Sequence, residues 1–120
     1  VIIDKAMKIV PKEYAACPIR NVIDRFGNKW SMLILYILDK GGTLRFSEIQ
    51  REMVDISQKM LSTTLKRLEE DRLITRTVYP EVPPRVEYAL TEVGKSLMPH
   101  ILGLTAWAVE HFDDVAGSNS

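Results

Sequence analysis

The sequence predicts a mainly α-helical fold of the α+β class, with one small β-hairpin. Three observations support this prediction. Apolar residues recur at helical spacing over most of the 120-residue chain. From Leu73 the pattern changes to β-branched residues that alternate with polar ones. A proline-rich stretch, 80–84, divides this second region into two runs and cannot belong to a strand ladder.

Two helices are predicted before the glycine pair at 41–42. Pro18 suits the first turn of a helix, and apolar residues follow it at helical spacing as far as Gly27, which is a typical stop. The segment from Lys29 to Asp39 is apolar on nearly all sides. Such a helix is typical of the centre of a core.

The middle of the chain predicts a small strand, a short helix and a longer helix. Residues 43–46 are too few for a helix and fit a strand. Ser47 to Gln50 match the spacing of a capping box, so we expect a short helix from Ser47 to about Val54. After a tight connection, Ser57 is a good N-cap for a helix that runs to about Asp71.

The C-terminal part predicts a hairpin and a long helix. The runs 74–79 and 86–90 are expected to pair across the prolines, and Thr91 caps the last helix. Pro99 and Gly103 inside that helix predict a kink or a break. Two helices joined by a three-residue turn, with a hairpin following at once, describe a winged helix-turn-helix.

Length and composition limit the class of protein. The chain fits a single domain, which we expect over 1–116, followed by a disordered tail over 117–120. We find no signal peptide and no apolar run long enough to span a membrane, and the lone cysteine, Cys17, excludes an intrachain disulfide. These features predict a cytoplasmic protein. The 16 basic residues balance 16 acidic ones, so a nucleic-acid surface must come from local placement.

Sequence motifs of catalysis are missing. The chain has no glycine-rich phosphate loop, no nucleophile elbow and no HExxH metal motif. His100 and His111 would lie about 16 Å apart on a regular helix, which is too far for a shared metal ion. We therefore expect neither an enzyme nor a cofactor or metal.

The helix after Ser57 combines one narrow apolar stripe with a polar side rich in hydrogen-bond donors. No carboxylate interrupts the donors before Glu69, and acidic residues gather at the C-terminal end. A recognition helix presents its N-terminal residues to the major groove, so this polarity suits DNA. Alone, the pattern also fits a solvated face; the neighbouring helix and hairpin favour DNA. The predicted DNA-binding residues of this helix are Ser57, Gln58, Lys59, Ser62, Thr63, Lys66 and Arg67.

Three further arginines extend the predicted DNA surface. Arg85 stands beside the stiff tip of the hairpin, where a cation suits contact with the DNA backbone or the minor groove. Arg76 lies on the same side of its strand as Ile74 and Val78, so it could equally be a structural arginine. Arg45, beside the small strand, could reach a phosphate or be merely solvated.

The last helix has more apolar surface than one domain needs. It carries two neighbouring apolar stripes, and Trp107 and Phe112 add aromatic area. One stripe serves the chain's own core, and we expect the second to pack against a second copy of the chain. The alternative is that the N-terminal segment covers it within the same chain. The predicted dimer residues on this helix are Leu97, Ile101, Leu104, Trp107 and Ala108.

Several segments together form a family pattern. They are Cys17-Pro18, Gly27-Asn28-Lys29-Trp30, Arg45-Phe46-Ser47-Glu48-Ile49, Ile56-Ser57-Gln58-Lys59-Met60-Leu61, Leu65-Lys66-Arg67-Leu68-Glu69 and, most specifically, Tyr79-Pro80-Glu81-Val82-Pro83-Pro84-Arg85-Val86-Glu87-Tyr88. In these segments the chain resembles the HxlR-type winged helix-turn-helix transcriptional regulators, a bacterial group similar in architecture to the MarR-type regulators. The resemblance covers about three quarters of the chain.

This resemblance implies a homodimer, joined through its N- and C-terminal helices, that binds a near-palindromic operator. It adds Ile19 and Ile23 to the dimer residues. In some family members the cysteine that matches Cys17 is a thiol sensor of oxidants or electrophiles. Members that form an intersubunit disulfide can use a second cysteine, which this chain lacks. Only a Cys17–Cys17 bridge, a small-thiol adduct or alkylation would then be open to it.

The prediction is thus a sequence-specific DNA-binding transcriptional regulator, a repressor or dual regulator, with double-stranded DNA and a second copy of itself as partners. Its expected effector is a small molecule or a thiol-reactive compound. The alternative is a winged-helix protein-interaction module that does not bind DNA, which the net charge of zero keeps open. The salt dependence of binding to duplex DNA distinguishes the two hypotheses, because binding through phosphates weakens steeply as the salt concentration rises.

Overall fold

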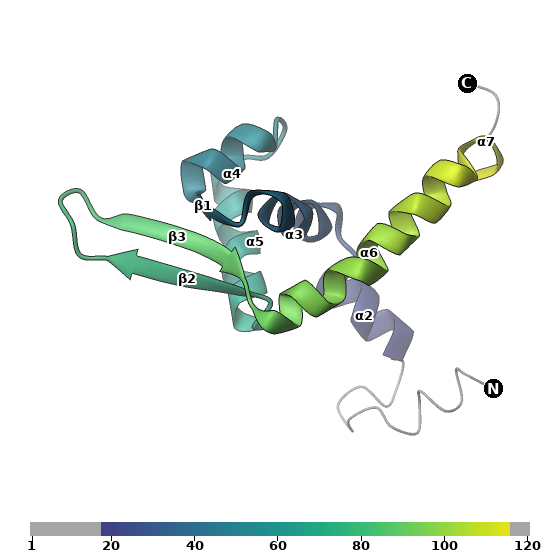
Figure 1. Cartoon of the computed structure of the whole chain (residues 1–120), viewed down its shortest axis with the longest axis horizontal. Coiled ribbons are helices and arrows are strands. Elements are labelled where there is room, and N and C mark those ends of the chain that lie inside the picture. Colours follow the sequence, from purple (N-terminus) through teal and green to yellow (C-terminus); the bar gives the residue numbers. More distant parts are fainter. Residues whose placement is uncertain (1–17, 116–120) are drawn as a thin grey trace.

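A computed structural model describes residues 18–115 of the chain, and it is mainly helical (Figure 1). The predicted tail and Cys17 lie outside the described residues, as does the side chain of Ile19. The observed order of helices and strands confirms the predicted α+β class and adds one terminal turn of helix. The elements are α2 (Pro18–Phe26), α3 (Lys29–Gly41), β1 (Thr43–Arg45), α4 (Phe46–Glu52), α5 (Gln58–Glu70), β2 (Ile74–Tyr79), β3 (Arg85–Leu90), α6 (Glu92–Glu110) and α7 (Phe112–Val115).

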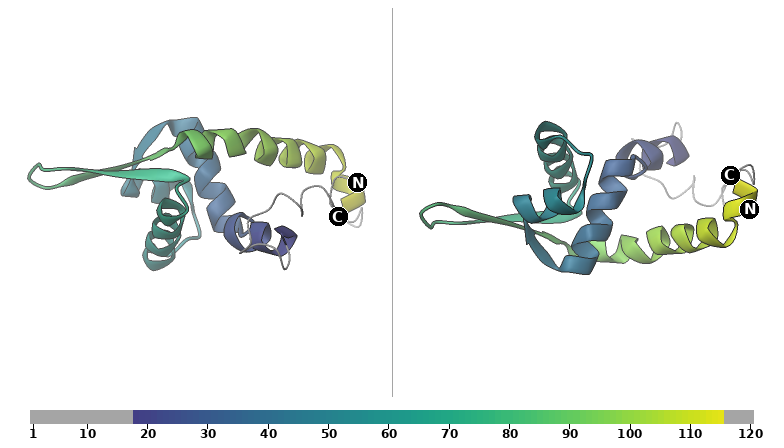
Figure 2. Two further views of the ribbon diagram at one scale, coloured as in Figure 1. Left: turned by 90° about the horizontal axis from the view of Figure 1, so that it is seen from below. Right: turned by 90° about the horizontal axis from the view of Figure 1, so that it is seen from above.

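Helix α3 lies at the centre of the fold, with α5 on one side and α6 on the other (Figure 2). It begins at Lys29 because the Asn28 side chain accepts a hydrogen bond from the Ser31 N–H at 2.9 Å. Ile34 and Leu35 are fully buried, as predicted for a central helix. Leu33 and Tyr36, however, are 40% and 38% exposed, so the helix is not covered on all sides as its composition suggested.

The helix-turn-helix consists of α4 and α5. Ser57 caps α5 as predicted, since its Oγ accepts a hydrogen bond from the Met60 N–H at 3.0 Å. The predicted cap of α4 is wrong. Its N-cap residue is Arg45, whose N–H donates to the Glu48 carboxylate at 2.8 Å, so Ser47 lies inside the first turn. The physical reason is that Glu48 stands three residues after Arg45 and therefore reaches that N–H.

The sheet is antiparallel, with β3 between β1 and β2. β2 and β3 pair along their full length, from Ile74 opposite Leu90 to Tyr79 opposite Arg85. Residues 80–84 form the connecting loop, which confirms the prediction made from the prolines. This hairpin, the wing, projects well beyond the helices (Figures 1 and 2).

Helix α6 leaves the sheet and extends away from the rest of the fold (Figure 1). The Thr91 Oγ1 caps it by accepting from the Gly94 N–H at 3.0 Å. The helix runs without interruption through Pro99 and Gly103, so of the predicted kink or break the break does not occur. Proline removes only one N–H from the ladder, so the remaining hydrogen bonds can hold the helix together around it.

Candidate nucleic-acid interface

The polar side of α5 faces solvent along the first two and a half turns. Lys59 and Lys66 form no ion pair with any described residue. Thr64, by contrast, is buried and donates to the Met60 carbonyl oxygen at 2.7 Å, which is a structural contact. The donors exposed on this face are Gln58, Lys59, Ser62, Thr63 and Lys66. They are free to contact phosphates or base edges.

Arg67 is an exception among the predicted DNA-binding residues. Its guanidinium donates to the backbone carbonyl oxygen of Asp24, near the end of α2. One turn later, Asp71 accepts from Arg25 of α2 at 2.6 Å, and the Asp71 side chain is only 11% exposed. These two contacts, which we call the α2–α5 joint, hold α2 against the C-terminal end of α5. Arg67 is therefore part of this joint, and at least one of its N–H donors is engaged within the protein.

Arg85 is also engaged within the protein. Its Nη2 lies 3.3 Å from a Glu81 carboxylate oxygen and its Nε lies 3.4 Å from one of Glu87. The guanidinium carbon lies 4.1 Å from the centre of the Tyr79 ring. The sequence suggested a free cation at the tip; the structure places Arg85 between two carboxylates and an aromatic face. It holds the wing loop to the strands.

Arg76 and Arg45 remain exposed and unpaired among the described residues. Arg76 on β2 has an exposed side chain, so it is accessible to a DNA phosphate. It lines the same cleft as Lys66 of α5, which brings together two cations that are ten positions apart in sequence. Arg45 lies at the start of α4, where its backbone caps the helix and its side chain is free.

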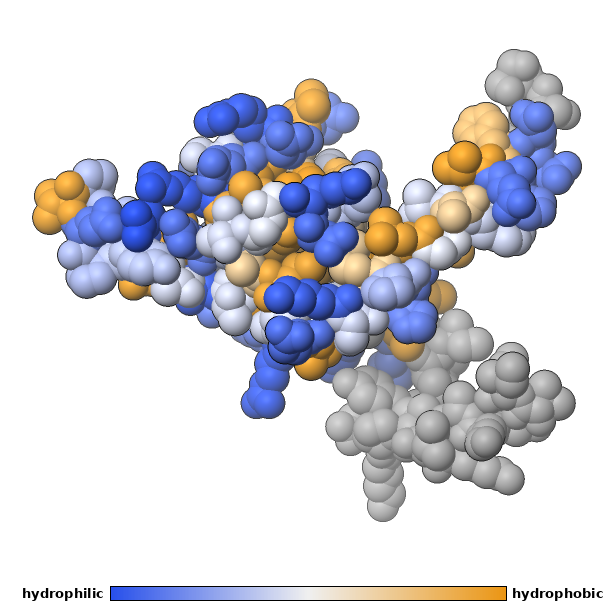
Figure 3. All heavy atoms as spheres, in the orientation of Figure 1, coloured by the Kyte–Doolittle hydropathy of each residue, from blue (hydrophilic) through white to orange (hydrophobic). Residues whose placement is uncertain are grey.

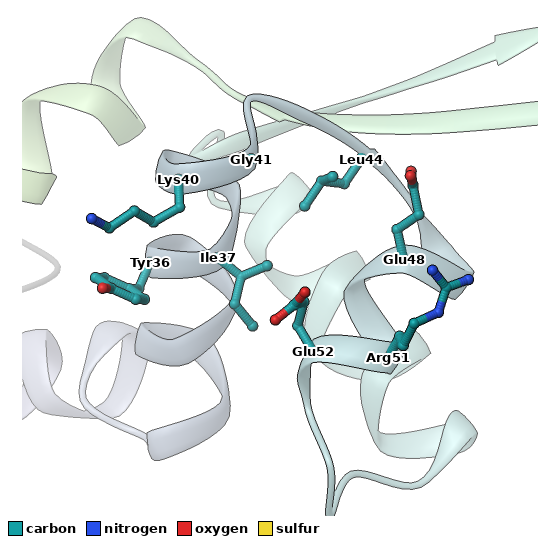
Figure 4. Close-up of a pocket in the computed structure, with 8 residues that line it drawn as sticks. All are labelled: Tyr36, Ile37, Lys40, Gly41, Leu44, Glu48, Arg51 and Glu52. Carbon is teal, nitrogen blue, oxygen red and sulfur yellow. The ribbon is translucent and has the colours of Figure 1, made fainter.

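A separate cleft of about 340 Å³ lies between α3, β1 and α4 (Figure 4). An apolar wall of this cleft faces acidic and basic side chains. One of the acidic residues, Glu48, already caps α4. The cleft includes no residue of α5, so it is distinct from the donor-rich face. Its lining residues are Tyr36, Ile37, Lys40, Gly41, Leu44, Glu48, Arg51 and Glu52.

The outer part of α6 exposes large apolar side chains, visible as orange atoms along this helix in Figure 3. Leu104 is 58% exposed and Trp107 is 51% exposed. The predicted dimer face changes in one respect: Ile101 is buried in the chain's own core and Leu97 is half-buried against it. Ile23 of α2 is exposed. The predicted dimer residues that keep exposed or half-exposed side chains on the outer part of α6 are Leu104, Trp107 and Ala108.

Residues 18–115 contain neither a metal-binding cluster nor a helix that could span a membrane. No group of three or more His, Cys, Asp or Glu side chains there could hold a metal ion. None of the described helices combines the length and the hydropathy that a membrane span needs.

A helix-turn-helix with a donor-rich second helix, followed by a projecting β-hairpin, defines the winged helix-turn-helix class of DNA-binding proteins. Within that class, the chain belongs to the HxlR-like helix-turn-helix family, whose model matches residues 25–116. The sequence resemblance is thereby confirmed.

Named relatives agree with this assignment. A protein of Methanothermobacter thermautotrophicus, described as an uncharacterised HTH-type transcriptional regulator, is 52% identical over 91 residues, which cover 76% of this chain and 69% of that protein. The structure of the redox regulator HypR in its reduced form matches with a TM-score of 0.76 and 37% identity, covering 82% of this chain and 97% of that one.

The reduced form of the transcriptional regulator YodB from Bacillus subtilis has a TM-score of 0.70 and 35% identity. That match covers 87% of this chain and 97% of YodB. The chain is therefore a transcriptional regulator with a helix-turn-helix domain, and the relatives it matches are regulators and not enzymes.

Proposed function

We propose that this regulator binds a specific, near-palindromic DNA operator as a homodimer, with α5 as its recognition helix. The observation that carries the proposal is the uninterrupted donor face of α5, where Lys59 and Lys66 have no ionic partner among residues 18–115. The two arginines that the sequence grouped with them, Arg67 and Arg85, are held by other parts of the protein. The remaining free donors are thus concentrated on the face that a major groove would meet.

The donors of α5 and of the start of α4 fall into two groups by position. Gln58 and Lys59 lie in the first turn, which enters the groove most deeply and can reach base edges. Lys66 lies two turns later, and Arg45 lies at the start of α4, where the walls of the groove present phosphates. We expect the first group to set sequence preference and the second group to set affinity.

Exposed apolar surface on α6 supports the homodimer. Leu104 and Trp107 lie on a helix that extends beyond the core, and a second copy of the chain would bury both. A two-fold dimer carries two α5 helices. To enter successive major grooves on one side of B-DNA, these must lie about 34 Å apart, which places half-site centres about 10 base pairs apart.

The test is binding to the promoter DNA next to the gene, measured by footprinting and by fluorescence anisotropy. Replacing Lys59 and Lys66 together by alanine should weaken binding at least about tenfold and leave the circular dichroism spectrum unchanged. The matched control is Lys40→Ala with Lys95→Ala, which removes the same charge from α3 and α6. Equal affinities for the two double variants would remove α5 from the recognition role.

We also infer that a thiol-reactive compound acts on the regulator through Cys17. HypR is named a redox regulator, and Cys17 directly precedes α2, which the α2–α5 joint ties to the recognition helix. Mass spectrometry should detect an adduct after treatment with a maleimide, together with a change in operator affinity. Cys17→Ser should abolish both effects. Unchanged affinity of the fully modified wild type would contradict a sensing role.

A further inference from the structure

We propose that the cleft between α5 and the sheet is a seat for one backbone phosphate of the bound DNA. This inference rests on the proposed function and adds a defined contact at the base of the wing, away from its tip. The cleft has a volume of about 340 Å³ and is open to solvent. Its lining residues are Phe46, Ser62, Lys66, Glu69, Arg76 and Tyr88.

Four elements supply these side chains, and α4 contributes only Phe46. Ser62, Lys66 and Glu69 follow one another at i, i+4 and i+7, so they share one face of α5. Arg76 of β2 stands opposite Tyr88 of β3 in the sheet register. Tyr88 is only 8% exposed, so it forms an apolar floor beneath the charged groups. A floor of this kind keeps the lysine and the arginine extended toward solvent.

The two cations of the cleft have no ionic partner among the described residues. Glu69 lines the same cleft, yet neither Lys66 nor Arg76 forms an ion pair with it or with another described acid. Arg25, Arg85 and Lys95 all do find a carboxylate partner within the fold. Two cations without an ionic partner among the described residues, together with the Ser62 hydroxyl, supply hydrogen-bond donors that suit a phosphodiester; Glu69 is the one carboxylate among the lining residues.

The surroundings of the cleft favour DNA as the source of this phosphate over a free anion. The cleft continues the donor face of α5, on which Lys59 and Thr63 are exposed. A recognition helix in the major groove brings its flank against one phosphate wall of that groove. The cleft is open and its two cations are solvated, so a small anion without further contacts would be held only weakly.

Glu69 restricts where the phosphate can lie. Its carboxylate stands at the end of the cleft-facing row on α5, and like charge repels a phosphate from that end. The phosphate is therefore directed toward Ser62, Lys66 and Arg76. Glu69→Gln should strengthen binding about equally for specific and non-specific DNA, because a phosphate contact carries no sequence information.

The experiment compares wild type with Lys66→Ala, Arg76→Ala and the double variant, by anisotropy on the footprinted operator over a series of salt concentrations. Each single substitution should weaken binding about fivefold or more for all sequences. Because both side chains of a protomer hold one phosphate, the double variant should lose only about one unit of salt slope per half-site, which is about two units and not four for the homodimer on its operator. The control is a double variant with Lys59→Ala and Arg76→Ala. The losses of binding free energy from its two substitutions should be additive.

Operators with a single neutral methylphosphonate in each half-site then locate the contact. At one position, the methylphosphonate should weaken binding by the wild type and leave binding by the Lys66→Ala, Arg76→Ala double variant unchanged. Lys59→Ala should weaken binding to that modified operator as much as it weakens binding to the unmodified one. If no position does this although wild type binds the operator, the phosphate seat is wrong and the proposed function stands. If wild type binds no DNA in a salt-dependent manner, both fail.

A titration with inorganic phosphate distinguishes a DNA phosphate from a free anion as the ligand of the cleft. Titration of the protein with inorganic phosphate alone, followed by nuclear magnetic resonance at Lys66 and Arg76, should show no saturation at millimolar concentration. Saturation there would identify a small-anion site and overturn the assignment to DNA. Arg76→Lys should retain more affinity than Arg76→Gln, since it keeps the charge; equal losses would also contradict the proposal.

Discussion

At the residue scale, the structure separates basic side chains that are indistinguishable in the sequence. Arg85 and Arg76 both lie on the wing, and both are candidates for phosphate contact by sequence. Arg85 has two carboxylates and a tyrosine ring around it, whereas Arg76 has no ionic partner among the described residues. A cation that is already paired gains less from a phosphate, because the existing contacts must first be given up.

Arg85→Gln should therefore change operator affinity less than about twofold, whereas Arg76→Gln should weaken binding by several fold. Anisotropy titrations of the two variants at one salt concentration make the comparison. Arg85→Gln should instead increase proteolytic cleavage of loop 80–84, because it loses its contacts with Glu81 and Glu87. An equal loss of affinity in both variants would mean that Arg85 contacts DNA as much as Arg76 does.

Ser31 provides a second prediction at this scale. Its side chain is fully buried in α3, and its Oγ has no hydrogen-bond partner. A buried, unpaired hydroxyl lowers stability, so Ser31→Ala should leave the free energy of unfolding unchanged or raise it by up to about 1 kcal/mol. Urea denaturation measures this. A loss of more than about 1 kcal/mol would mean that the hydroxyl is paired in solution.

At the element scale, two glycines of α6 have opposite surroundings. A Cβ at Gly94 would lie 2.2 Å from the Leu73 carbonyl oxygen, whereas a Cβ at Gly103 would meet nothing within 4 Å. Gly94→Ala should destabilise the fold by about 2 kcal/mol or more, because α6 must move away from the turn before β2. Gly103→Ala should stabilise it by about 0.5–1 kcal/mol through helix propensity. Thermal melts of the two variants test the pair.

The α2–α5 joint predicts a local effect. Asp71→Asn weakens the contact with Arg25, which is 43% exposed, so the cost in global stability should stay near or below about 1 kcal/mol. The larger effect should be on α2, because the joint lies at its C-terminal end. Amide hydrogen exchange should accelerate in α2 and not in α3. Unchanged exchange in α2 would show that the joint does not hold this helix.

At the scale of the whole molecule, assembly decides how the operator is read. Leu104 is 58% exposed and lies outside the core, so Leu104→Glu should leave the monomer folded and place a charge within the proposed interface. Sedimentation should show wild type as a dimer and the variant as a monomer near 13.7 kDa. The control is Val82→Glu at the fully exposed wing tip, which should remain a dimer. A monomeric wild type would refute both the dimer and the palindromic operator.

The order of the elements and most of their ends could be predicted, because the signals for them are local. Asn28, Ser57 and Thr91 each bond a backbone N–H three residues further along the chain. The prolines within residues 80–84 show that this segment is not a strand, because a proline cannot donate a ladder hydrogen bond wherever it lies in the fold. The same reasoning misplaced the cap of α4, since Gln50 follows Ser47 and Glu48 follows Arg45 at the same three-residue spacing, and only the folded backbone shows which of the two bonds forms.

By itself, then, the sequence determined the helices, the wing, the family and the donor-rich face of α5. Only the tertiary structure decided which cations are free and which apolar side chains of α6 are covered. Arg25 and Asp71 are 46 residues apart in sequence, and Arg67 and Asp24 are 43 apart, so no local pattern joins them. Ile101 is buried while Leu104 is exposed on the same helix. The physical reason is that ion pairing and burial depend on which elements pack together, and that is a property of the folded chain.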